Sequence, residues 1–302
     1  MGFPENQRLQ FFGLESAEVE LYVKREDFLH PVISGNKFRK LKYNLQQAKK
    51  EKYTKLLTFG GAYSNHILAV ACAGHEQGLE TIGVIRGEEL QKQWEDNPTL
   101  KKAFEYGMQF NFVSREEYRQ KNKKHFVEAL QSKYGNPMIL PEGGTNTLAV
   151  KGCMEILTAE DASFNHICCA VGTGGTISGL INASERHQTV LGFPALKGDF
   201  LKADIATFVK RDNLNLISDY HFGGYGKVDE VLVNFINTFK KETGIPLDPV
   251  YTGKMMFGIL DLIQKGHFQK GSKILAIHTG GLQGIAGMNQ RLKQRKMPLL
   301  EI

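Results

Sequence analysis

The sequence is poor in cysteine, proline and tryptophan, and it contains no long apolar run. Its 302 residues include 4 cysteines, 9 prolines and 1 tryptophan. The cysteines form no CxxC pair and no histidine cluster has the spacing of zinc ligands, which disfavours a disulfide framework and a metal centre. Because spanning a bilayer takes roughly 20 consecutive apolar residues, we also expect no membrane-spanning segment.

The N-terminus and the charge distribution disfavour a secreted protein and a nucleic-acid-binding protein. The segment MGFPENQRLQFF has no basic region followed by an apolar stretch, so we expect no secretory signal. Cys168 and Cys169 lie in the apolar run HICCAV and are expected in the core as free thiols, which is typical of a reducing, cytoplasmic environment. The net charge is +6, but the densest basic segments, KNKKHF and RLKQRK, do not alternate with aromatic residues, which disfavours nucleic-acid binding.

A regular alternation of short apolar runs and helical patterns indicates an α/β fold. Strands are predicted at residues 20–27, 55–60, 80–86, 109–114, 137–144, 165–172, 189–196 and 272–281. Helices are predicted at residues 37–50, 64–78, 97–107, 123–135, 147–160, 176–185, 232–244 and 258–266. Such alternation predicts open, mostly parallel twisted sheets with helices on both faces.

Three glycine-rich segments follow predicted strands. They are GGAYSNH, VGTGGTISG and HTGGLQG, and each begins where a strand ends. In open parallel sheets ligands bind at the carboxyl ends of the strands, so these segments mark the expected site.

The segment VGTGGTISG is the most specific of the three. Its glycines permit close backbone approach, and successive amides at the start of a helix can bind an anion such as a single phosphate. Its spacing matches neither a dinucleotide fingerprint nor a Walker loop, and a tight turn without a ligand is the alternative. The residues of the proposed phosphate loop are Gly172, Thr173, Gly174, Gly175 and Thr176.

The segment GGAYSNH offers a second place for an anion. Ser64, Asn65 and His66 open a predicted helix, so their amides are available to a carboxylate. Alternatively, Ser64 simply caps the helix, Asn65 pairs with a phenolic oxygen, and His66 is a buried, hydrogen-bonded residue.

Lys37 stands at the first turn of a predicted helix, directly after Gly35 and Asn36 in SGNKFRK. Taken alone it is an ordinary lysine. Beside a phosphate loop and a carboxylate loop, it suggests a Schiff-base lysine, which needs partial desolvation and a fixed position. Pyridoxal 5′-phosphate carries both an aldehyde and one phosphate, so it is the cofactor that this set favours.

Six motifs together resemble one family. SGNKFRKL, GGAYSNH, PEGGTN, VGTGGT, DPVYTGK and HTGG occur in this order across nearly the whole chain. They resemble the 1-aminocyclopropane-1-carboxylate deaminase/D-cysteine desulfhydrase family of tryptophan-synthase-β-like, fold type II pyridoxal-phosphate enzymes. The resemblance implies a cofactor cleft between a large domain, residues 1–44 plus 146–302, and a small domain, residues 45–145. It also implies a small amino-acid substrate and a homodimer.

The resemblance implies a role for each motif. Lys37 would form the Schiff base, the loop from Gly172 to Thr176 would bind the cofactor phosphate, and Asn65 would contact the cofactor. The substrate would meet Ser64, Asn65, His66, Tyr225 in FGGYGKV and Tyr251 in DPVYTGK, with Ser64 and the two tyrosines also catalytic. Either tyrosine could instead be a core residue, and Lys254 is interpreted as an ordinary surface lysine without a role.

Two threonines favour one branch of the family. The cyclopropane deaminases carry Glu after the second tyrosine and Leu after the HxGG histidine, where this chain has Thr252 and Thr279. A hydroxyl at the pyridine nitrogen gives a weaker electron sink than a carboxylate. That weaker electron sink suffices when a good leaving group departs from the substrate Cβ. The resemblance favours Thr252 as the residue that contacts the pyridine nitrogen.

We therefore predict a lyase that converts D-cysteine to hydrogen sulfide, pyruvate and ammonia. The alternatives are deamination of 1-aminocyclopropane-1-carboxylate to 2-oxobutyrate, a β-replacement sulfhydrylase-like enzyme, and a non-catalytic pyridoxal-phosphate-binding protein.

Overall fold

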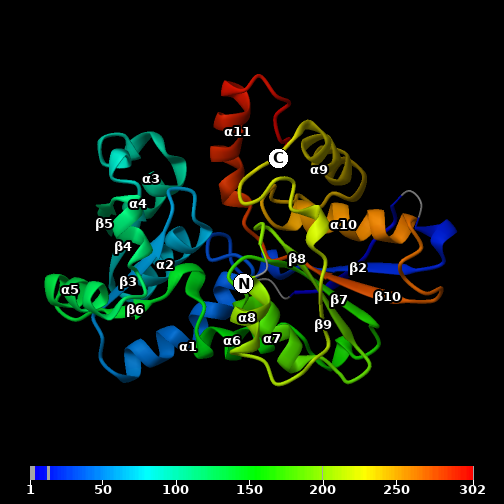
Figure 1. Cartoon of the computed structure of the whole chain (residues 1–302), viewed down its shortest axis with the longest axis horizontal. Helices are drawn as coiled ribbons and strands as arrows, with labels where there is room; N and C mark the ends of the chain where they lie inside the picture. Colours follow the sequence, from blue (N-terminus) through cyan, green and yellow to red (C-terminus); the bar gives the residue numbers. More distant parts are fainter. Residues whose placement is uncertain (1–3, 12–13, 199, 302) are drawn as a thin grey trace.

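The computed structural model describes residues 4–11, 14–198 and 200–301, and its strands form two sheets (Figure 1). The larger sheet has the order β1-β2-β10-β7-β8-β9, and all its pairs are parallel except β1 with β2. The smaller sheet has the order β5-β4-β3-β6 and is entirely parallel. The predicted α/β class with two open, mostly parallel sheets is therefore confirmed.

The strands of the larger sheet are β1 (Asn6–Arg8), β2 (Glu20–Lys24), β7 (His166–Val171), β8 (Thr189–Pro194), β9 (Leu214–Leu216) and β10 (Lys273–Ile277). Those of the smaller sheet are β3 (Lys55–Gly60), β4 (Glu80–Arg86), β5 (Met108–Val113) and β6 (Met138–Leu140).

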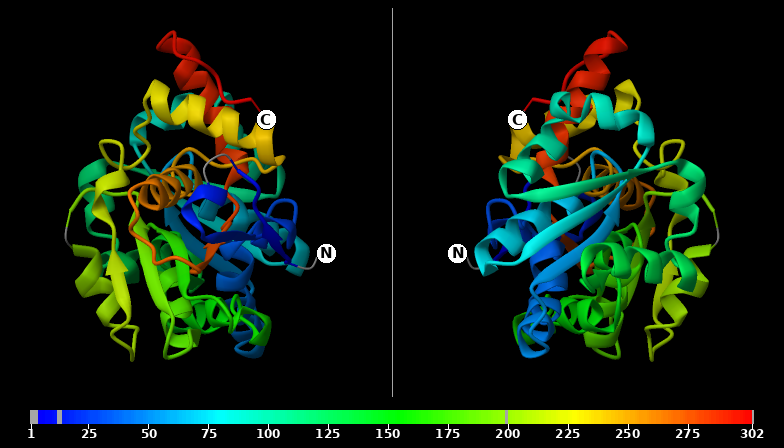
Figure 2. Two further views of the ribbon diagram at one scale, coloured as in Figure 1. Left: turned by 90° about the vertical axis from the view of Figure 1, so that its right-hand side faces the viewer. Right: turned by 90° about the vertical axis from the view of Figure 1, so that its left-hand side faces the viewer.

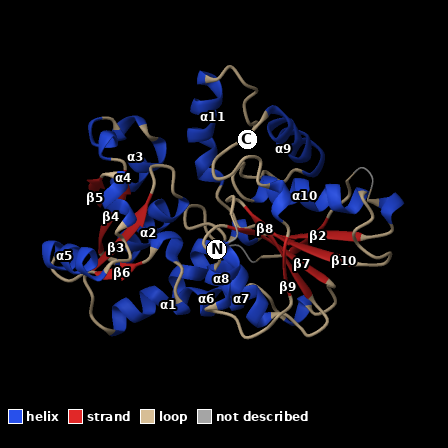
Figure 3. Cartoon of the chain, in the orientation of Figure 1, coloured by secondary structure: helices blue, strands red, loops and turns tan. Residues whose placement is uncertain are grey.

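Helices surround both groups of strands (Figure 3). They are α1 (Asn36–Lys50), α2 (Asn65–Gln77), α3 (Pro98–Glu105), α4 (Arg115–Arg119), α5 (Lys124–Tyr134), α6 (Thr147–Met154), α7 (Gly175–Ala183), α8 (Phe200–Ala206), α9 (Glu230–Thr243), α10 (Thr252–Gln264) and α11 (Ile285–Gln294). Helix α11 contacts α3, so the C-terminal part of the chain lies against the part that carries the smaller sheet (Figure 2). Among the described helices, none combines the length and apolarity that a membrane crossing requires.

Local side-chain chemistry sets several helix ends where the sequence predicts them. Asn97 accepts hydrogen bonds from the amides of Thr99 and Leu100 and starts α3, with Pro98 at the first helical position. Gly78 adopts φ +66° and ends α2.

Two predicted helices have an end that differs by six residues from the structure, and α4, α8 and α11 were not predicted. Helix α6 ends at Met154, although residues 147–160 were expected to be helical. Helix α10 begins at Thr252 rather than at residue 258, because the Asp248 carboxylate accepts hydrogen bonds from the amides of Val250, Tyr251 and Thr252. The DPVYTGK segment is therefore the capped start of a helix.

The core is divided between the sheets. One group of buried apolar side chains joins β3 and β4 to α2, and another joins β2, β7 and β10 to α9 and α10. Cys168 and Cys169 are fully buried in β7, as expected, and the four cysteines are free.

The four strands of the smaller sheet lie between residues 55 and 140, inside the segment expected to form the small domain. A boundary at residue 45 would cut α1, since this helix continues to Lys50. We therefore propose that the small domain begins after Lys50 and that the two segments flanking it form the large domain.

Helix α1 packs against α6 with almost no space between the two backbones. A Cβ added at Gly152 in α6 would lie 2.0 Å from the carbonyl oxygen of Arg39 in α1. This crossing fixes the first two turns of α1, which carry Lys37 and Lys40.

We predict that Gly152→Ala destabilises the protein by about 1–3 kcal/mol, because the added methyl group forces the two helices apart. Urea unfolding of the cofactor-free protein measures this. Gly284→Ala is the control, since a Cβ there meets only the Asn65 side chain, at 3.5 Å. Equal unfolding midpoints for the two variants would contradict the role of the crossing.

Candidate active site

Two lysines of α1 converge on one carbonyl group of the loop after β6. The Lys37 Nζ donates to the Gly143 oxygen at 3.2 Å, and the Lys40 Nζ donates to the same oxygen at 2.9 Å. Lys40 also donates to the Thr145 hydroxyl at 3.0 Å. The PEGGTN segment, which carries Gly143 and Thr145, therefore lies directly against the predicted Schiff-base lysine.

The predicted phosphate loop borders the same lysines. The hydroxyl oxygens of Thr145 and Thr173 lie 2.6 Å apart, in hydrogen-bonding contact. The Asn36 side chain donates to the Thr176 hydroxyl at 2.7 Å. A Cβ added at Gly175 would lie 2.7 Å from the Thr145 hydroxyl and 3.1 Å from the Lys40 Nζ.

An anion fits this arrangement. The N-terminus of α7 presents free amides, the glycine leaves the approach open, and a lysine and hydroxyl groups lie around it. The structure thus brings Lys37 together with the residues from Gly172 to Thr176.

Burial changes the chemistry of both lysines. It lowers the pKa of Lys37 well below its ordinary value, and the charge of Lys40 lowers it further. Burial also lowers the pKa of Lys40. An amine that loses its proton more easily is a better nucleophile, so Lys37 suits attack on a carbonyl carbon.

The second predicted loop contains polar atoms without partners. Ser64 caps α2 by accepting from the Ile67 amide at 3.4 Å. The Asn65 Oδ1 and the His66 Nδ1 are buried and make no hydrogen bond with the described residues. Asn65 faces the loop after β10, because a Cβ added at Gly281 would lie 2.8 Å from its Nδ2. Orphaned polar atoms of this kind indicate a place for a ligand.

His66 is an uncharged residue. Its Nε2 lies 2.9 Å from the Thr58 hydroxyl, and burial, with the charges of Lys37 and Lys40, lowers its pKa well below the ordinary value. A neutral imidazole cannot form an ion pair with a substrate carboxylate, so any contact there would be a neutral hydrogen bond.

The two predicted tyrosines form a pair. The rings of Tyr225 and Tyr251 meet edge to face, with centroids 6.2 Å apart. A Cβ added at Gly172 would lie 3.2 Å from the Tyr251 hydroxyl, so Tyr251 borders the phosphate loop. Tyr225 keeps 48% of its surface exposed, yet its hydroxyl end is enclosed, and burial raises the pKa of both phenols. Both hydroxyls therefore keep their protons at neutral pH.

The structure gives the Thr252 hydroxyl a partner other than a ring nitrogen. Thr252 is fully buried, its hydroxyl donates to the Asp248 carboxylate at 2.8 Å, and it accepts from the Asp248 amide at 2.9 Å. Since the only hydroxyl proton is already used, this geometry does not support the expected contact between Thr252 and the pyridine nitrogen.

Thr279 lies against the turn before Lys37. A Cβ added at Gly35 would lie 2.0 Å from the Thr279 carbonyl oxygen, which accepts from the Asn36 amide at 3.3 Å. Within the described part of the chain, the Thr279 hydroxyl makes no hydrogen bond, so its proton is available.

Sequence reasoning missed Lys40, Asp248 and Lys254. The spacing of Lys40, three residues after Lys37, places both on one helix face and could have revealed it. Lys254 was expected at the surface, but it is only 2% exposed and donates to the carbonyl oxygens of His221 and Gly224. That expectation was wrong because the helix starts earlier than predicted and turns this side chain inward.

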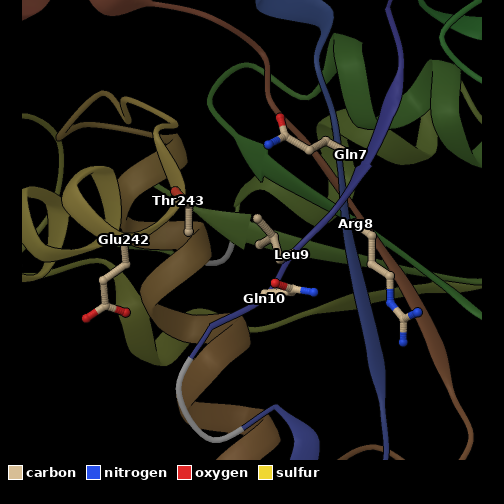
Figure 4. A pocket seen from close by; sticks show the side chains of 6 residues that line it. All are labelled: Gln7, Arg8, Leu9, Gln10, Glu242 and Thr243. Carbon is tan, nitrogen blue, oxygen red and sulfur yellow. The ribbon is translucent and has the colours of Figure 1, made fainter.

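Two other features lie apart from this site. A surface pocket of about 240 Å³ beside β1 and the end of α9 (Figure 4) contains none of the predicted residues. His30, Cys72 and Glu76 lie close together. The His30 Nδ1 accepts hydrogen bonds from two backbone amides, so the proton of this imidazole is on Nε2, which donates to Glu76. Neither ring nitrogen then has a free lone pair for a metal ion.

The fold and the site define a two-sheet α/β protein in which two lysines lie beside a glycine-rich loop that an anion fits. The family model described as "Pyridoxal-phosphate dependent enzyme" matches residues 7–280. A putative 1-aminocyclopropane-1-carboxylate deaminase of Pyrococcus horikoshii is 32% identical, over 93% of this chain and 91% of its own length. The chain therefore belongs to the pyridoxal-phosphate dependent enzyme family, which confirms the predicted cofactor.

Two further relatives agree with this assignment. The bifunctional D-cysteine desulfhydrase/1-aminocyclopropane-1-carboxylate deaminase of Arabidopsis thaliana is 30% identical, over 88% of this chain and 73% of its own length. The crystal structure of an ACC deaminase homologue is 28% identical, with a TM-score of 0.82 over 96% of this chain and 93% of the other.

We predict that Lys40→Met raises the pKa of Lys37 in the cofactor-free protein, because a neighbouring positive charge disappears while burial remains. A lower pKa leaves the amine reactive at lower pH, so labelling of Lys37 by an acylating reagent should begin at higher pH in the variant. Mass spectrometry of the labelled peptides measures the shift.

Lys49→Met is the control for this prediction. It removes the same charge from the exposed end of α1, roughly 18 Å away along the helix and beyond the screening length of about 8–10 Å. If Lys37 labels with the same pH dependence in the Lys40→Met protein and the wild type, the coupling of the two lysines is wrong.

Proposed function

We propose that the protein catalyses β-elimination from D-cysteine, with hydrogen sulfide, pyruvate and ammonia as products. The names of its relatives support a D-cysteine desulfhydrase or a 1-aminocyclopropane-1-carboxylate deaminase, and the Arabidopsis relative carries both. Deamination of the cyclopropane substrate is therefore the second candidate.

The choice between the two substrates rests on the hydrogen bonds that the Asp248 carboxylate already accepts. It lies 3.5 Å from a Cβ added at Gly281, close to the loop that holds Thr279. Three amides and the Thr252 hydroxyl donate to it, which uses its acceptor capacity. The partner left for a ring nitrogen is then the neutral Thr279 hydroxyl, which suits a substrate with a good leaving group.

We assign the cofactor-binding roles to residues whose positions fit them. Lys37 would hold the cofactor carbonyl, and the loop from Gly172 to Thr176, with Lys40, would hold its phosphate. When bound, pyridoxal phosphate supplies an electron sink for negative charge at the substrate Cα.

The substrate roles follow from the second loop and the tyrosines. Ser64 and Asn65 at the start of α2 would bind the substrate carboxylate. The freed amine of Lys37, which burial keeps ready to lose its proton, would take the Cα proton as general base. Tyr225 and Tyr251 keep their protons and could donate one to the departing sulfur. We further propose that the protein works as a homodimer in the cytoplasm.

We predict that the purified protein releases sulfide and pyruvate in equal amounts from D-cysteine, with little 2-oxobutyrate from 1-aminocyclopropane-1-carboxylate. A panel assay of small D- and L-amino acids that measures sulfide, pyruvate and 2-oxobutyrate tests this. Thr279→Val removes the free hydroxyl with little change in volume and should lower D-cysteine turnover more than cofactor binding. Ring opening as fast as desulfuration in the wild type would contradict the argument from Asp248 and the Thr279 hydroxyl.

A further inference from the structure

Lys254 is a buried lysine that the proposed mechanism does not use. It lies in the first turn of α10, and its Nζ donates to the His221 oxygen at 2.8 Å and to the Gly224 oxygen at 2.9 Å. Burying an ammonium is unfavourable unless it is hydrogen-bonded, so these two bonds are the reason that it is tolerated. Both acceptors belong to the loop that carries Tyr225.

This loop has an unusual backbone. Phe222, Gly223, Gly224 and Gly226 all have positive φ, at 50°, 84°, 112° and 63°. A phenylalanine in this region is strained and is held there only by its surroundings. The Phe222 ring packs edge to face on Phe257 of α10, with centroids 5.1 Å apart. The loop therefore depends on α10 for its shape.

The first turn of α10 thus reaches both tyrosines of the site. Tyr251 is the N-cap residue of the helix, and Tyr225 directly follows Gly224, whose carbonyl group Lys254 holds. Tyr225 is 48% exposed, and its ring contacts that of Tyr251. The contact between the two tyrosines therefore requires the 221–226 backbone to hold Tyr225 beside Tyr251, and Lys254 bonds that backbone at the residue before Tyr225.

We propose that Lys254 is a positioning residue, which fixes the 221–226 loop so that the Tyr225 hydroxyl stays beside Tyr251 and the substrate. It acts through Tyr225 and touches neither substrate nor cofactor. This inference rests on the proposed role of Tyr225, whereas the ordering of the loop by Lys254 is independent of which substrate is used.

A double-mutant cycle tests the proposal. Lys254→Met removes the donors with little change in volume, and displacing a substrate-contacting group by about 1 Å costs on the order of 100-fold in rate. We expect kcat/KM for D-cysteine to fall at least about 10-fold, mainly through kcat. In the Tyr225→Phe background the same change should alter kcat/KM less than about 2-fold, because two residues that act as one unit do not add.

Hydrogen exchange supplies a readout that does not depend on activity. In the holoenzyme, Lys254→Met should speed exchange in the peptide spanning residues 221–226, whereas Lys241→Met, at an exposed position near the end of α9, should not. If Lys254→Met fails to fold by circular dichroism, Lys254→Leu, which also removes the N–H donors but is shorter, is judged by the same criteria.

Two results would overturn the proposal. One is an unchanged exchange rate in the 221–226 peptide of a folded variant. The other is a double-mutant cycle in which the fold-losses in kcat/KM from Lys254→Met and from Tyr225→Phe multiply in the double variant. If the wild type does not turn over D-cysteine, the proposed function fails, and the exchange measurement still decides whether Lys254 orders the loop.

Discussion

The carbonyl oxygen of Gly143 accepts hydrogen bonds from both Lys37 and Lys40, and the rest of the site depends on this contact. It joins the first turn of α1 to the segment between β6 and α6. Because Lys40 also bonds Thr145, which contacts Thr173, the same contact reaches the loop at the start of α7. One carbonyl group therefore sets the separation between the reactive amine and the anion-binding loop.

The polar groups of the site are held by helix ends. Ser64 caps α2, Asp248 caps α10, and the glycines from 172 to 175 open α7. Free amides at these ends can bind anions, while side chains such as Lys37 stand in the first turns. Capping and ligand binding use the same groups, which explains why Asp248, committed to capping, is unavailable as a carboxylate for the cofactor.

Local patterns predicted much of this structure. The bounds of β3 and β4, and the Asn97 and Gly78 helix ends, follow from short-range periodicity and capping, which a single segment contains. The positions of Lys37 and of residues 172–176 could be predicted because each lies at a strand or helix end, whereas their roles stay predictions. The burial of Lys254 and the Thr252–Asp248 pair could not, since they depend on where α10 starts and on which loop packs against it. The short strands β1 and β9 were also missed, because three-residue strands have almost no periodicity to detect.

Borohydride reduction of the holoprotein, followed by peptide mapping, tests the central claim that Lys37 is the amine that holds the cofactor. Reduction makes the bond permanent, so the cofactor mass should be found on the peptide that contains Lys37, and Lys37→Met should abolish it. Lys40 lies one turn away with its own lowered pKa, so the mapping must resolve the two lysines. A label on Lys40 or on any other lysine, or a protein that takes up no pyridoxal phosphate, would contradict the claim.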